Sequence, residues 1–493
     1  MKKKNFKRII HQAITPIVLG TAGLFTMVIN TQCQQPKDLN ISVYSSSLDG
    51  DRLTKKPNIG FESSSNSTAA VITVDEGKQF QKIDGFGATF NEAGMICLNS
   101  LNPEAKEEVL KQLFDSESGA GYTLMKSPIA ACDFASGGPW YTYDDSPGDT
   151  AMTHFSIERD LGPTGLITFI KAASKYGKFE IQSPMDFAPD WMYYAIKMGQ
   201  KHIKPEYYPA LAKYYQKYLH AYASNDVNIK YLDLFNEGDN KWYSNVTYKV
   251  MGELIKKYVG TQLEASGLKT RVQFGETAFR SEGARKFPEF LGDPEIKKYV
   301  SSMAVHGYDT IKHYEDCTEL HNKFPDLPIW MTEVCWVKVP IHEFSDGEYW
   351  GNMIMNDMKN WVSGWIYWNM ILDNGGGPWL TSVEHGDPDN NRQHPVVIIN
   401  RDTKEVTYTG LFYYLEHFSK FVRPGAYRIN TTGGSDQLNF AAFKNTDGSI
   451  VLNIINNGAE TDCKVAVANK MADQKLKAHS ITTLQWNEVK SKQ

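Results

Sequence analysis

Short apolar runs alternate with longer amphipathic stretches over most of the chain beyond residue 80. The stretches, such as 103–114, 207–223, 248–265 and 351–362, carry apolar residues at intervals of three and four, which predicts helices. The runs have the length and composition typical of buried β-strands. The predicted strands cover residues 81–90, 121–129, 179–186, 231–237, 272–277, 302–308, 327–333 and 364–370.

This alternation predicts the fold class. Eight strands that are each followed by a helix favour an α/β protein with a (β/α)8 TIM barrel, with insertions, over residues 81–420. A doubly wound open sheet is the alternative, and it requires a glycine-rich phosphate-binding turn after an early strand. The turn at 85–90, GFGATF, lacks the third glycine of that motif, so the barrel is the better prediction.

The pattern changes near residue 421, where short alternating runs follow one another between Gly, Asn and Asp turns. We therefore predict an antiparallel β-sandwich over residues 421–493. Residues 33–80 are expected to form a linker and N-terminal strands, and the strand-like segment 69–77 is expected to join the sandwich. The side domain is then discontinuous in sequence.

Residues 1–32 have the features of a signal peptide, because a basic head precedes an apolar stretch that Pro16 interrupts. Cys33 follows them and is a candidate for the lipid-bearing cysteine of a bacterial lipoprotein, although Gln32 stands where such sites usually carry a small residue. Lipid anchoring and ordinary secretion both stay open. The expected location is the periplasm, the outer membrane or the outside of the cell.

Charge and cysteine content limit the partners and cofactors that the sequence supports. The formal net charge of −5 and the lack of basic blocks after the N-terminus argue against a nucleic-acid partner, and leave the possible anchor as the expected membrane contact. No Cys-x-x-Cys pair supports a zinc or thioredoxin-like site, so we expect no metal and no cofactor. We expect buried, unpaired thiols at Cys97, Cys132, Cys317, Cys335 and Cys463.

Polar side chains stand where the predicted strands end, and in a TIM barrel these carboxyl ends surround the site of chemistry. Glu237 and Glu333 are the carboxylates that end otherwise apolar strands, the fourth and the seventh, so we expect them to face one another across the barrel mouth. The other strand ends supply Asp133, Phe134, Asn236, Glu276, His306, Tyr308, Trp368 and Asn369.

A facing pair of carboxyl groups about 5–5.5 Å apart is what glycoside hydrolysis with retention requires. Asn236, beside Glu237, is placed to bond the sugar 2-hydroxyl. Repulsion within the pair is expected to raise the pKa of the acid and to give an acidic pH optimum. The alternative is that Glu237 and Glu333 are strand caps or structural ion pairs. His306 is either a catalytic base or a hydrogen-bonded wall residue beside Tyr308.

Other chemistries lack their motifs. The sequence contains no Gly-x-Ser-x-Gly, Gly-x4-Gly-Lys or His-Glu-x-x-His, so acyl transfer, phosphoryl transfer and zinc proteolysis have no support.

An ordered set of segments resembles glycoside hydrolase family 30, especially its glucosylceramidase group and bacterial relatives. The resemblance implies a barrel with a side β-sandwich, Glu237 as the acid/base and Glu333 as the nucleophile. The segments are FQKIDGFGATFNEAG, ACDFASGGPWYTYDDSPGD, FNEG, MAVHGYD, WMTEVCW, WIYWNMILDNGGGPW and GLFYYLEHFSKFVRPGAYRI.

The same resemblance assigns substrate contacts. Asp133 and Phe134 resemble the walls of the pocket for the non-reducing sugar, with Asp133 binding ring hydroxyls. Tyr308 resembles the tyrosine that orients the nucleophile, with His306 beside it. Trp368 resembles the aromatic floor under the sugar.

Two departures from the family affect the substrate. Lys126 stands where the glucosylceramidase group has an arginine, so bidentate geometry is lost and the charge is kept. The segment SPMDFAPDW has Met185 and Asp186 where that group has a tryptophan, with one extra residue before Trp191. We list Lys126, Asp186 and Trp191 as further substrate-binding residues. Asp186 either reads the 4- and 6-hydroxyls together with Asp133, or points to solvent while Met185 fills the space.

The expected function is therefore an exported retaining β-glycosidase that acts on β-linked glucose, with β-1,6-glucan preferred to a sphingolipid as substrate. Another β-hexoside, such as a galactan or a fucoside, is the alternative within the same class. A non-catalytic glycan-binding barrel is the alternative from a different class.

Overall fold

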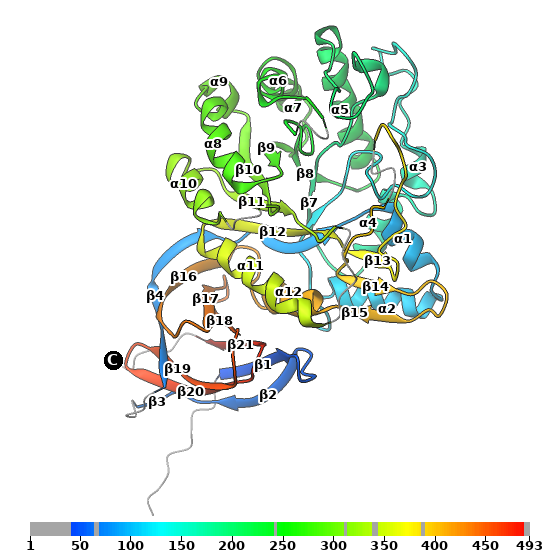
Figure 1. Ribbon diagram of the computed structural model, residues 1–493. Coiled ribbons are helices and arrows are strands. Elements are labelled where there is room, and N and C mark those ends of the chain that lie inside the picture. Colours follow the sequence, from blue (N-terminus) through cyan, green and yellow to red (C-terminus); the bar gives the residue numbers. More distant parts are fainter. Residues whose placement is uncertain are drawn as a thin grey trace, which may run out of the picture. The chain divides into compact units, whose positions relative to one another are not determined.

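The computed structural model describes residues 41–63, 69–240, 244–309, 313–337, 344–385 and 390–487. The predicted signal peptide and Cys33 lie outside the described residues. Within them, Figure 1 shows a barrel surrounded by helices and a separate assembly of antiparallel strands.

The predicted barrel is confirmed. Within the described ranges, eight parallel strands close into a barrel, with β12 pairing with β5 (Figure 1). Each predicted run overlaps one of them. The strands are β5 (Gly85–Thr89), β6 (Leu124–Lys126), β7 (Glu180–Ser183), β8 (Ile229–Leu232), β9 (Arg271–Thr277), β10 (Val300–His306), β11 (Ile329–Glu333) and β12 (Val362–Asn369).

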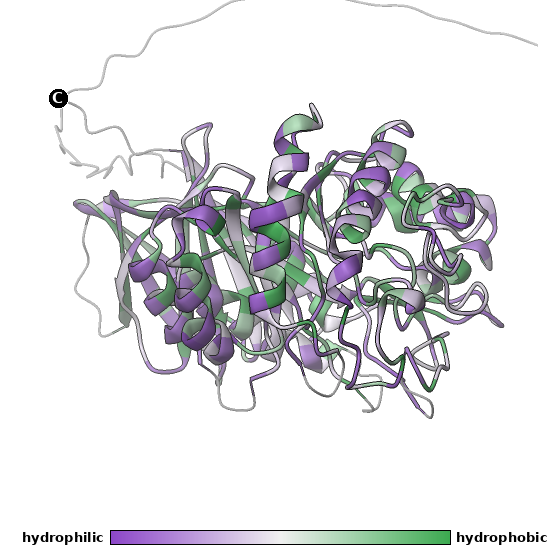
Figure 2. Cartoon of the chain, turned by 90° about the horizontal axis from the view of Figure 1, so that it is seen from above, coloured by the Kyte–Doolittle hydropathy of each residue, from purple (hydrophilic) through white to green (hydrophobic). Residues whose placement is uncertain are grey.

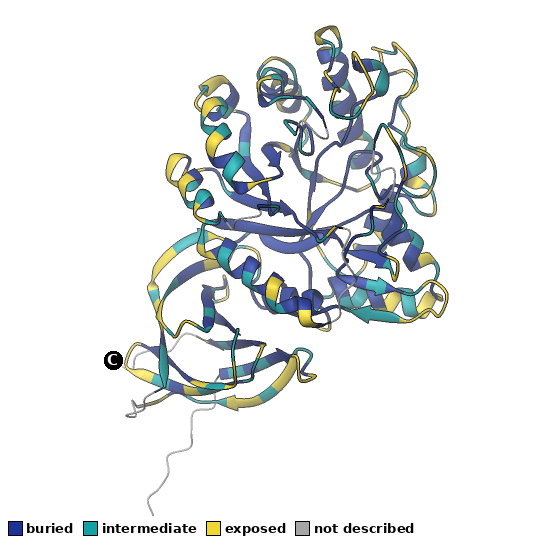
Figure 3. Ribbon diagram, viewed as in Figure 1, coloured by how far each residue is buried: buried dark blue, intermediate teal, exposed yellow. Residues whose placement is uncertain are grey.

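Helices cover the outside of the barrel. Purple and green alternate along them in Figure 2, and Figure 3 shows yellow, exposed positions on the helices around strands that are almost wholly buried. The helices are α1 (Glu92–Asn99), α2 (Pro103–Phe114), α3 (Glu158–Leu161), α4 (Leu166–Ala173), α5 (Tyr208–Ala223), α6 (Tyr248–Leu254), α7 (Gly260–Ala265), α8 (Arg280–Leu291), α9 (Pro294–Lys297), α10 (Glu315–Lys323), α11 (Gly347–Lys359) and α12 (Gly410–Ser419). Short 3-10 turns occur at η1 (Asp190–Met192), η2 (Pro205–Tyr207) and η4 (Phe344–Asp346).

Helix boundaries follow local sequence signals. The predicted helix at 103–114 is α2, where the Asn102 side chain accepts a hydrogen bond from the Ala105 N–H and Pro103 occupies the first turn. The predicted helix at 248–265 consists of α6, a π-helical segment η3 (Ile255–Val259) and α7.

Residues inside the barrel show how far along the strands the site lies. Leu124, Tyr231, Trp330 and Ile366 form an apolar cluster of their own, contributed by four barrel strands. Side chains two positions apart in a strand point to the same face. Lys126 follows Leu124 and Trp368 follows Ile366 by two positions, so both side chains point to the same side as this cluster, nearer the carboxyl ends of the strands.

The second assembly of strands confirms the discontinuous β-sandwich. Its strand order is β2-β1-β21-β18-β17-β16-β4-β19-β20-β3, and contact between β2 and β20 brings its two ends together. The strands are β1 (Ile41–Ser47), β2 (Thr54–Ile59), β3 (Glu62–Ser63), β4 (Ala70–Lys82), β16 (Tyr427–Gly433), β17 (Leu438–Lys444), β18 (Ser449–Asn456), β19 (Thr461–Val467), β20 (Lys470–Leu476) and β21 (Ser480–Asn487).

Both ends of the described chain contribute to this sheet. β1 pairs with β21, and β4 lies between β16 and β19, so the N-terminal strands are integral to the sandwich. Inward-facing residues such as Ile72, Phe440, Leu452 and Trp486 form its core. The domain limits at 33–80, 81–420 and 421–493 stay predictions.

Two smaller features complete the fold. A three-stranded sheet of β13 (Ile371–Asp373), β14 (Val397–Ile399) and β15 (Val406–Tyr408) follows β12 and was not expected from the sequence. The five cysteines in the described part of the chain are free and buried, as predicted.

A fully buried ion pair joins α8 to α11. The Arg280 guanidinium donates two hydrogen bonds to Asp357, at 2.8 and 2.7 Å, and lies 3.3 Å from an oxygen of Asp309. The Asp357 carboxylate also accepts a hydrogen bond from the Trp365 indole at 3.1 Å. Both partners of the pair have 0% exposed side chains.

We expect Asp357→Asn to lower the free energy of unfolding by about 3 kcal/mol, because it leaves the buried Arg280 charge without its main counter-charge. Urea denaturation followed by circular dichroism measures the loss. The exposed Glu289 of α8 provides the control, since Glu289→Gln should change stability by less than about 0.5 kcal/mol. A loss in Asp357→Asn as small as that of the control would show that the pair does not hold the two helices together.

Candidate active site

The strand-end carboxylates and their polar neighbours meet at the carboxyl ends of the barrel strands. Glu333 ends β11, His306 ends β10 and Glu276 lies near the end of β9. The sequence predicted a strand over 231–237, but β8 ends at Leu232. Glu237 therefore lies in a turn beyond the strand.

This turn is held against β9 by its backbone. The Asn236 N–H donates to the Met185 carbonyl at 2.8 Å, and the Glu237 N–H donates to the Glu276 carbonyl at 2.8 Å. Glu237 has φ of 46° and Glu276 has φ of 51°, which is left-handed backbone for two non-glycine residues. Such conformations cost of order 1–3 kcal/mol each and concentrate at functional sites.

The two predicted catalytic carboxylates face one another. One carboxylate oxygen of Glu237, one of Glu333 and a ring nitrogen of His306 lie within 4.8 Å of one another. This separation suits the roughly 5–5.5 Å between carboxyl groups that double displacement at a sugar requires. The alternative that these residues are strand caps at the surface does not fit, because the side chains are only 16% and 8% exposed.

Two donors hold Glu333. The Tyr308 hydroxyl donates to Oε1 at 3.0 Å, and the Lys126 ammonium donates to Oε2 at 2.8 Å. The orientation of Glu333 is therefore fixed from both sides. Tyr308 also lies 3.4 Å from the Cys335 sulfur.

Lys126 is the central cation of the site. Its buried ammonium lies 3.0 Å from Asn236 Oδ1, 2.7 Å from Glu276 Oε2 and 2.8 Å from Glu333 Oε2. Burial acts to lower the pKa of Lys126, but the Glu276 and Glu333 carboxylates outweigh burial and raise the pKa above its usual value. The ammonium is also 5.2 Å from the centre of the Trp368 ring.

His306 lies between two carboxylates. Its Nδ1 is 3.1 Å from Glu237 Oε1 and its Nε2 is 3.2 Å from Glu276 Oε2. Burial acts to lower the pKa of His306, whereas Glu333, Glu237 and Glu276 together raise it to about 9. The ring therefore carries a charge at neutral pH.

The expected pKa of the acid is wrong for this structure. Burial acts to raise the pKa of Glu237, but hydrogen bonds from His306 and Asn240 and the charges of His306 and Lys126 lower it below the usual value. Repulsion by Glu333 does not prevail. The reason is that two buried cations, Lys126 and His306, lie beside the carboxylates, and the strand pattern does not reveal these contacts.

Asp133, Phe134 and Trp368 form one wall. The ring centres of Phe134 and Trp368 are 6.4 Å apart at 76°. Asp133 Oδ2 accepts hydrogen bonds from Asn391 at 2.8 Å and Gln393 at 3.4 Å. Burial raises the pKa of Asp133 to about 7 and Glu333 adds to the rise. The sugar-binding roles predicted for this wall stay predictions.

Asp186 and Trp191 have different surroundings. Asp186 is 2% exposed and Met185 is 0% exposed, so the alternative that Asp186 points to solvent is wrong. The Trp191 indole donates to the Asp144 carbonyl at 3.0 Å and packs edge-on against Tyr207. These described contacts of Trp191 are with Asp144 and with Tyr207 of η2 rather than with the carboxylate pair.

Sequence reasoning noted Glu276 as a strand end but did not include it in the site. It also missed Asn391 and Gln393, which lie in the segment between β13 and β14 and have no strand-end signal. Both reach Asp133, and Gln393 also accepts a hydrogen bond from Asn369 at 2.6 Å.

Among the described residues, two groups of side chains have the spacing to hold a metal ion. In the first, Glu237, His306 and Glu333, the Lys126 ammonium already supplies a cation beside Glu333. The second is Asp144, Asp149 and His154 in a loop, where Asp149 accepts hydrogen bonds from the His154 N–H and the Thr153 hydroxyl.

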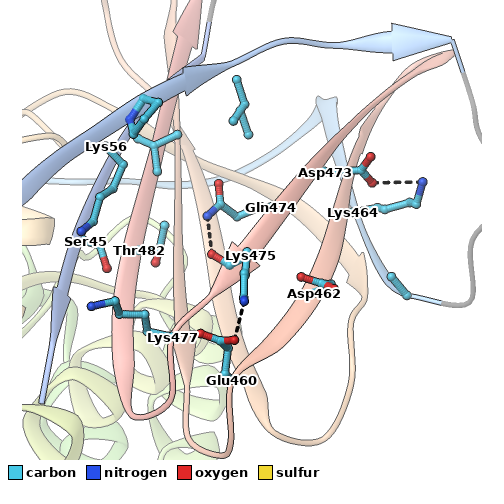
Figure 4. A pocket seen from close by; sticks show the side chains of 14 residues that line it. Ser45, Lys56, Glu460, Asp462, Lys464, Asp473, Gln474, Lys475, Lys477 and Thr482 are labelled. Carbon is cyan, nitrogen blue, oxygen red and sulfur yellow. Dashed lines mark hydrogen bonds and ion pairs between the residues drawn. The ribbon is translucent and has the colours of Figure 1, made fainter. Parts of the chain in front are cut away.

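A cavity of about 770 Å³ lies on the sandwich (Figure 4). Figure 4 shows that four of its charged side chains pair with one another, Lys475 with Glu460 and Lys464 with Asp473, at 2.5 and 3.1 Å. Two further lysines of the lining, Lys56 and Lys477, pair with Asp51. No helix in the described ranges is both long and apolar enough to cross a bilayer.

Comparisons with known proteins agree with the geometry. The family model described as "Glycosyl hydrolase family 30 TIM-barrel domain" matches residues 83–422, and that of the "Glycosyl hydrolase family 30 beta sandwich domain" matches residues 425–484. The lysosomal acid glucosylceramidase of Mus musculus is 26% identical, over 91% of this chain and 86% of its own.

Two glucanases are also similar. The endo-1,6-beta-D-glucanase BGN16.3 of Trichoderma harzianum is 27% identical, over 96% of this chain and 99% of its own. The solved structure of the endo-beta1,6-glucanase BT3312 superposes with a TM-score of 0.79 at 23% identity, covering 91% of this chain and 99% of that chain.

Proposed function

The chain belongs to glycosyl hydrolase family 30 and is a glycoside hydrolase, and on that basis we propose that Glu333 is the nucleophile and Glu237 the acid/base of a retaining β-glycosidase. The single observation that carries this assignment is the approach of the two carboxylates, with one oxygen of each within 4.8 Å of the other. The alternative of a non-catalytic glycan-binding barrel is dropped, because the family is hydrolytic and both carboxylates are in place.

The reaction proceeds in two displacements. In the first, a Glu333 oxygen bonds to the anomeric carbon while the bond to the leaving oxygen breaks and that oxygen takes a proton from Glu237. In the second, Glu237 removes a proton from water, the water oxygen bonds to the anomeric carbon, and the bond to Glu333 breaks. Each step inverts the anomeric centre, so the configuration is retained.

The neighbours of the pair have distinct tasks. Because Asn236 Oδ1 accepts from Lys126, its amide Nδ2 is the group that donates to the sugar 2-hydroxyl. Tyr308 and Lys126 fix the nucleophile, and Phe134 and Trp368 form the apolar wall for the sugar ring.

The substrate is a β-linked glucoside or glucan. Relatives named as a glucosylceramidase and as endo-1,6-β-glucanases support glucose in the pocket, and β-1,6-glucan is our first choice. Another β-hexoside is the second candidate, because Met185 and Asp186 stand where the glucosylceramidase group has a tryptophan.

A panel of aryl β-glycosides, β-glucans of defined linkage and glucosylceramide tests the assignment. We expect turnover of aryl β-glucoside and of β-1,6-glucan, and early proton NMR spectra should show the β-anomer as the first product. Formation of the α-anomer first would overturn the double displacement. Turnover of galactoside or fucoside but not glucoside would select the second substrate candidate.

We expect Asp186→Asn to lower kcat/KM on one of the three sugars, glucoside, galactoside or fucoside, by at least about 30-fold more than on the other two. The physical reason is that a buried carboxylate which accepts from a ring hydroxyl discriminates strongly against a sugar without that hydroxyl in place. The exposed Asp145 supplies the control, Asp145→Asn. Equal, small losses on all three sugars would remove Asp186 from sugar recognition.

We also propose that the protein is exported from the cytoplasm. We assign residues 1–32 to a signal peptide, with a lipid anchor at Cys33 as one mode of retention and free secretion as the other. The mass of the mature N-terminus distinguishes them, because an anchored chain begins with an acylated Cys33.

A further inference from the structure

Glu276 is a third carboxylate at the reaction centre, and the double displacement has no task for it. Its side chain is 0% exposed, so it does not reach substrate. Its backbone is nevertheless left-handed and bonded to that of Glu237, and the preceding Gly275 has φ of 137°. A side chain at position 275 would lie 2.3 Å from the Ala304 carbonyl, so the chain is built to turn the Glu276 carboxylate inward.

A single oxygen of Glu276 holds both cations of the site. Its Oε2 lies 2.7 Å from the Lys126 ammonium and 3.2 Å from His306 Nε2. Each cation then bonds a member of the reacting pair, Lys126 to Glu333 and His306 to Glu237. Glu276 is therefore the carboxylate that both cations share.

The geometry also places one proton in the contact between His306 and Glu237. Both ring nitrogens of His306 face carboxylate oxygens, which accept hydrogen bonds and cannot donate them when ionised. Only the imidazolium form donates from both nitrogens. The donors of Lys126 are likewise all occupied, since its three N–H groups meet three acceptors, Asn236, Glu276 and Glu333.

We propose that Glu276 is a positioning residue. It keeps Lys126 and His306 charged and within hydrogen-bond distance of Glu333 and Glu237. The inference rests on the proposed roles of the pair and extends them. The proton that the leaving oxygen needs is then shared along the 3.1 Å contact between His306 Nδ1 and Glu237 Oε1. Glu237 gives it up in the first displacement and takes a new one from water in the second, and Glu276 again stabilises that proton at the contact.

The direction of the pH effect follows from the charges around His306. It faces Glu237 from the β8 turn, Glu276 from β9, Tyr308 from the β10 loop and Glu333 from β11, and Lys126 of β6 lies behind Glu276. Asp233, also buried, has a pKa raised well above its usual value by burial and by Glu276.

In the wild type the His306 pKa of about 9 means that the shared proton is lost only as the pH rises through about 9. Removing the Glu276 charge removes one of the carboxylates that raise this pKa. The proton is then lost at a lower pH.

The decisive variant is Glu276→Gln, which removes the charge and keeps the shape. On an aryl β-glucoside with a poor leaving group we expect kcat to fall at least about 30-fold with KM little changed, and the basic limb of kcat/KM to move down by about one pH unit. Glu276→Asp keeps the charge and shortens the reach, so it should lower kcat but keep the basic limb of the wild type.

A matched control comes from the same strand end. Glu282 of α8 bonds Thr277 and Lys286 and has no contact with the pair, so Glu282→Gln should keep both the rate and the pH profile. Nitrogen-15 NMR of the His306 ring, titrated in wild type and Glu276→Gln, measures the proton directly. A 15N titration of His306 that is unchanged in Glu276→Gln overturns the proposal.

Failure of the proposed function and failure of the positioning role of Glu276 give different results. A wild type that hydrolyses no β-glycoside would defeat the proposed function, whereas the His306 titration still tests the link to Glu276. An active wild type with identical pH profiles in Glu276→Gln and Glu282→Gln would defeat the positioning role alone. Should Glu276→Gln fail to fold, the pH profile and NMR titration of Glu276→Asp decide: a basic limb displaced like that expected for loss of charge would contradict the proposal.

Discussion

Glu333→Ala should lower kcat on every substrate by at least about 10⁴-fold, because the nucleophile that forms the glycosyl-enzyme is removed and no neighbouring group can replace it. Glu237→Ala should lower kcat strongly on substrates with poor leaving groups and much less on an activated aryl glycoside, whose departure needs no proton. Azide should then restore turnover in Glu237→Ala, since a small anion attacks the glycosyl-enzyme without a general base.

The glycosyl azide formed in that rescue must have the β-configuration. An α-glycosyl azide, or rescue that occurs in Glu333→Ala and not in Glu237→Ala, would exchange or abolish the two roles. Glu180 is the control, because it starts β7 at the opposite end of the barrel and pairs with Lys230. Glu180→Gln should retain wild-type activity.

Lys126→Met should lower kcat/KM by about 10³-fold, the second-largest effect that the structure predicts. The substitution keeps the length of the side chain and removes the charge that contacts both Glu276 and Glu333, so these two buried carboxylates lose the ammonium that they share. Removal of one preorganised hydrogen-bond donor from an active site commonly costs a factor of about 10²–10³ in rate. Steady-state kinetics, with circular dichroism to establish folding, measures the loss.

Lys126→Arg separates charge from geometry. It keeps the cation but spreads it over a planar fork, so it should retain more activity than Lys126→Met and less than the wild type. Lys230→Met, at the amino end of β8, is the matched control and should be fully active. If Lys126→Met kept more than about a tenth of wild-type kcat/KM, the ammonium would be a structural rather than a functional counter-charge.

The barrel and the reacting pair were predictable because they depend on local pattern. Glu237 and Glu333 follow apolar runs, and any (β/α)8 barrel brings such positions to one face. The end of β8 was not predictable, since the chain leaves the strand at Leu232 and returns to the mouth by a left-handed turn at Glu237.

The features of the site that the sequence did not predict depend on contacts between segments that are far apart in the chain. Gln393 reaches Asp133 from a loop, and the pKa of Glu237 depends on His306 and Lys126, which come from β10 and β6. Neither relation leaves a trace in periodicity. Asp186 illustrates the same limit, because its sequence context allowed either burial or exposure.

The pairing of β1 with β21 has a consequence for synthesis. Roughly 430 residues separate the two strands, and ribosomes add about 5–20 residues per second, so β1 waits of order half a minute or more for its neighbour. During that interval the barrel can close, since β12 reaches β5 earlier in translation. A nascent chain stopped short of residue 480 thus has all eight strands of the described barrel, whereas its sandwich sheet lacks one central strand.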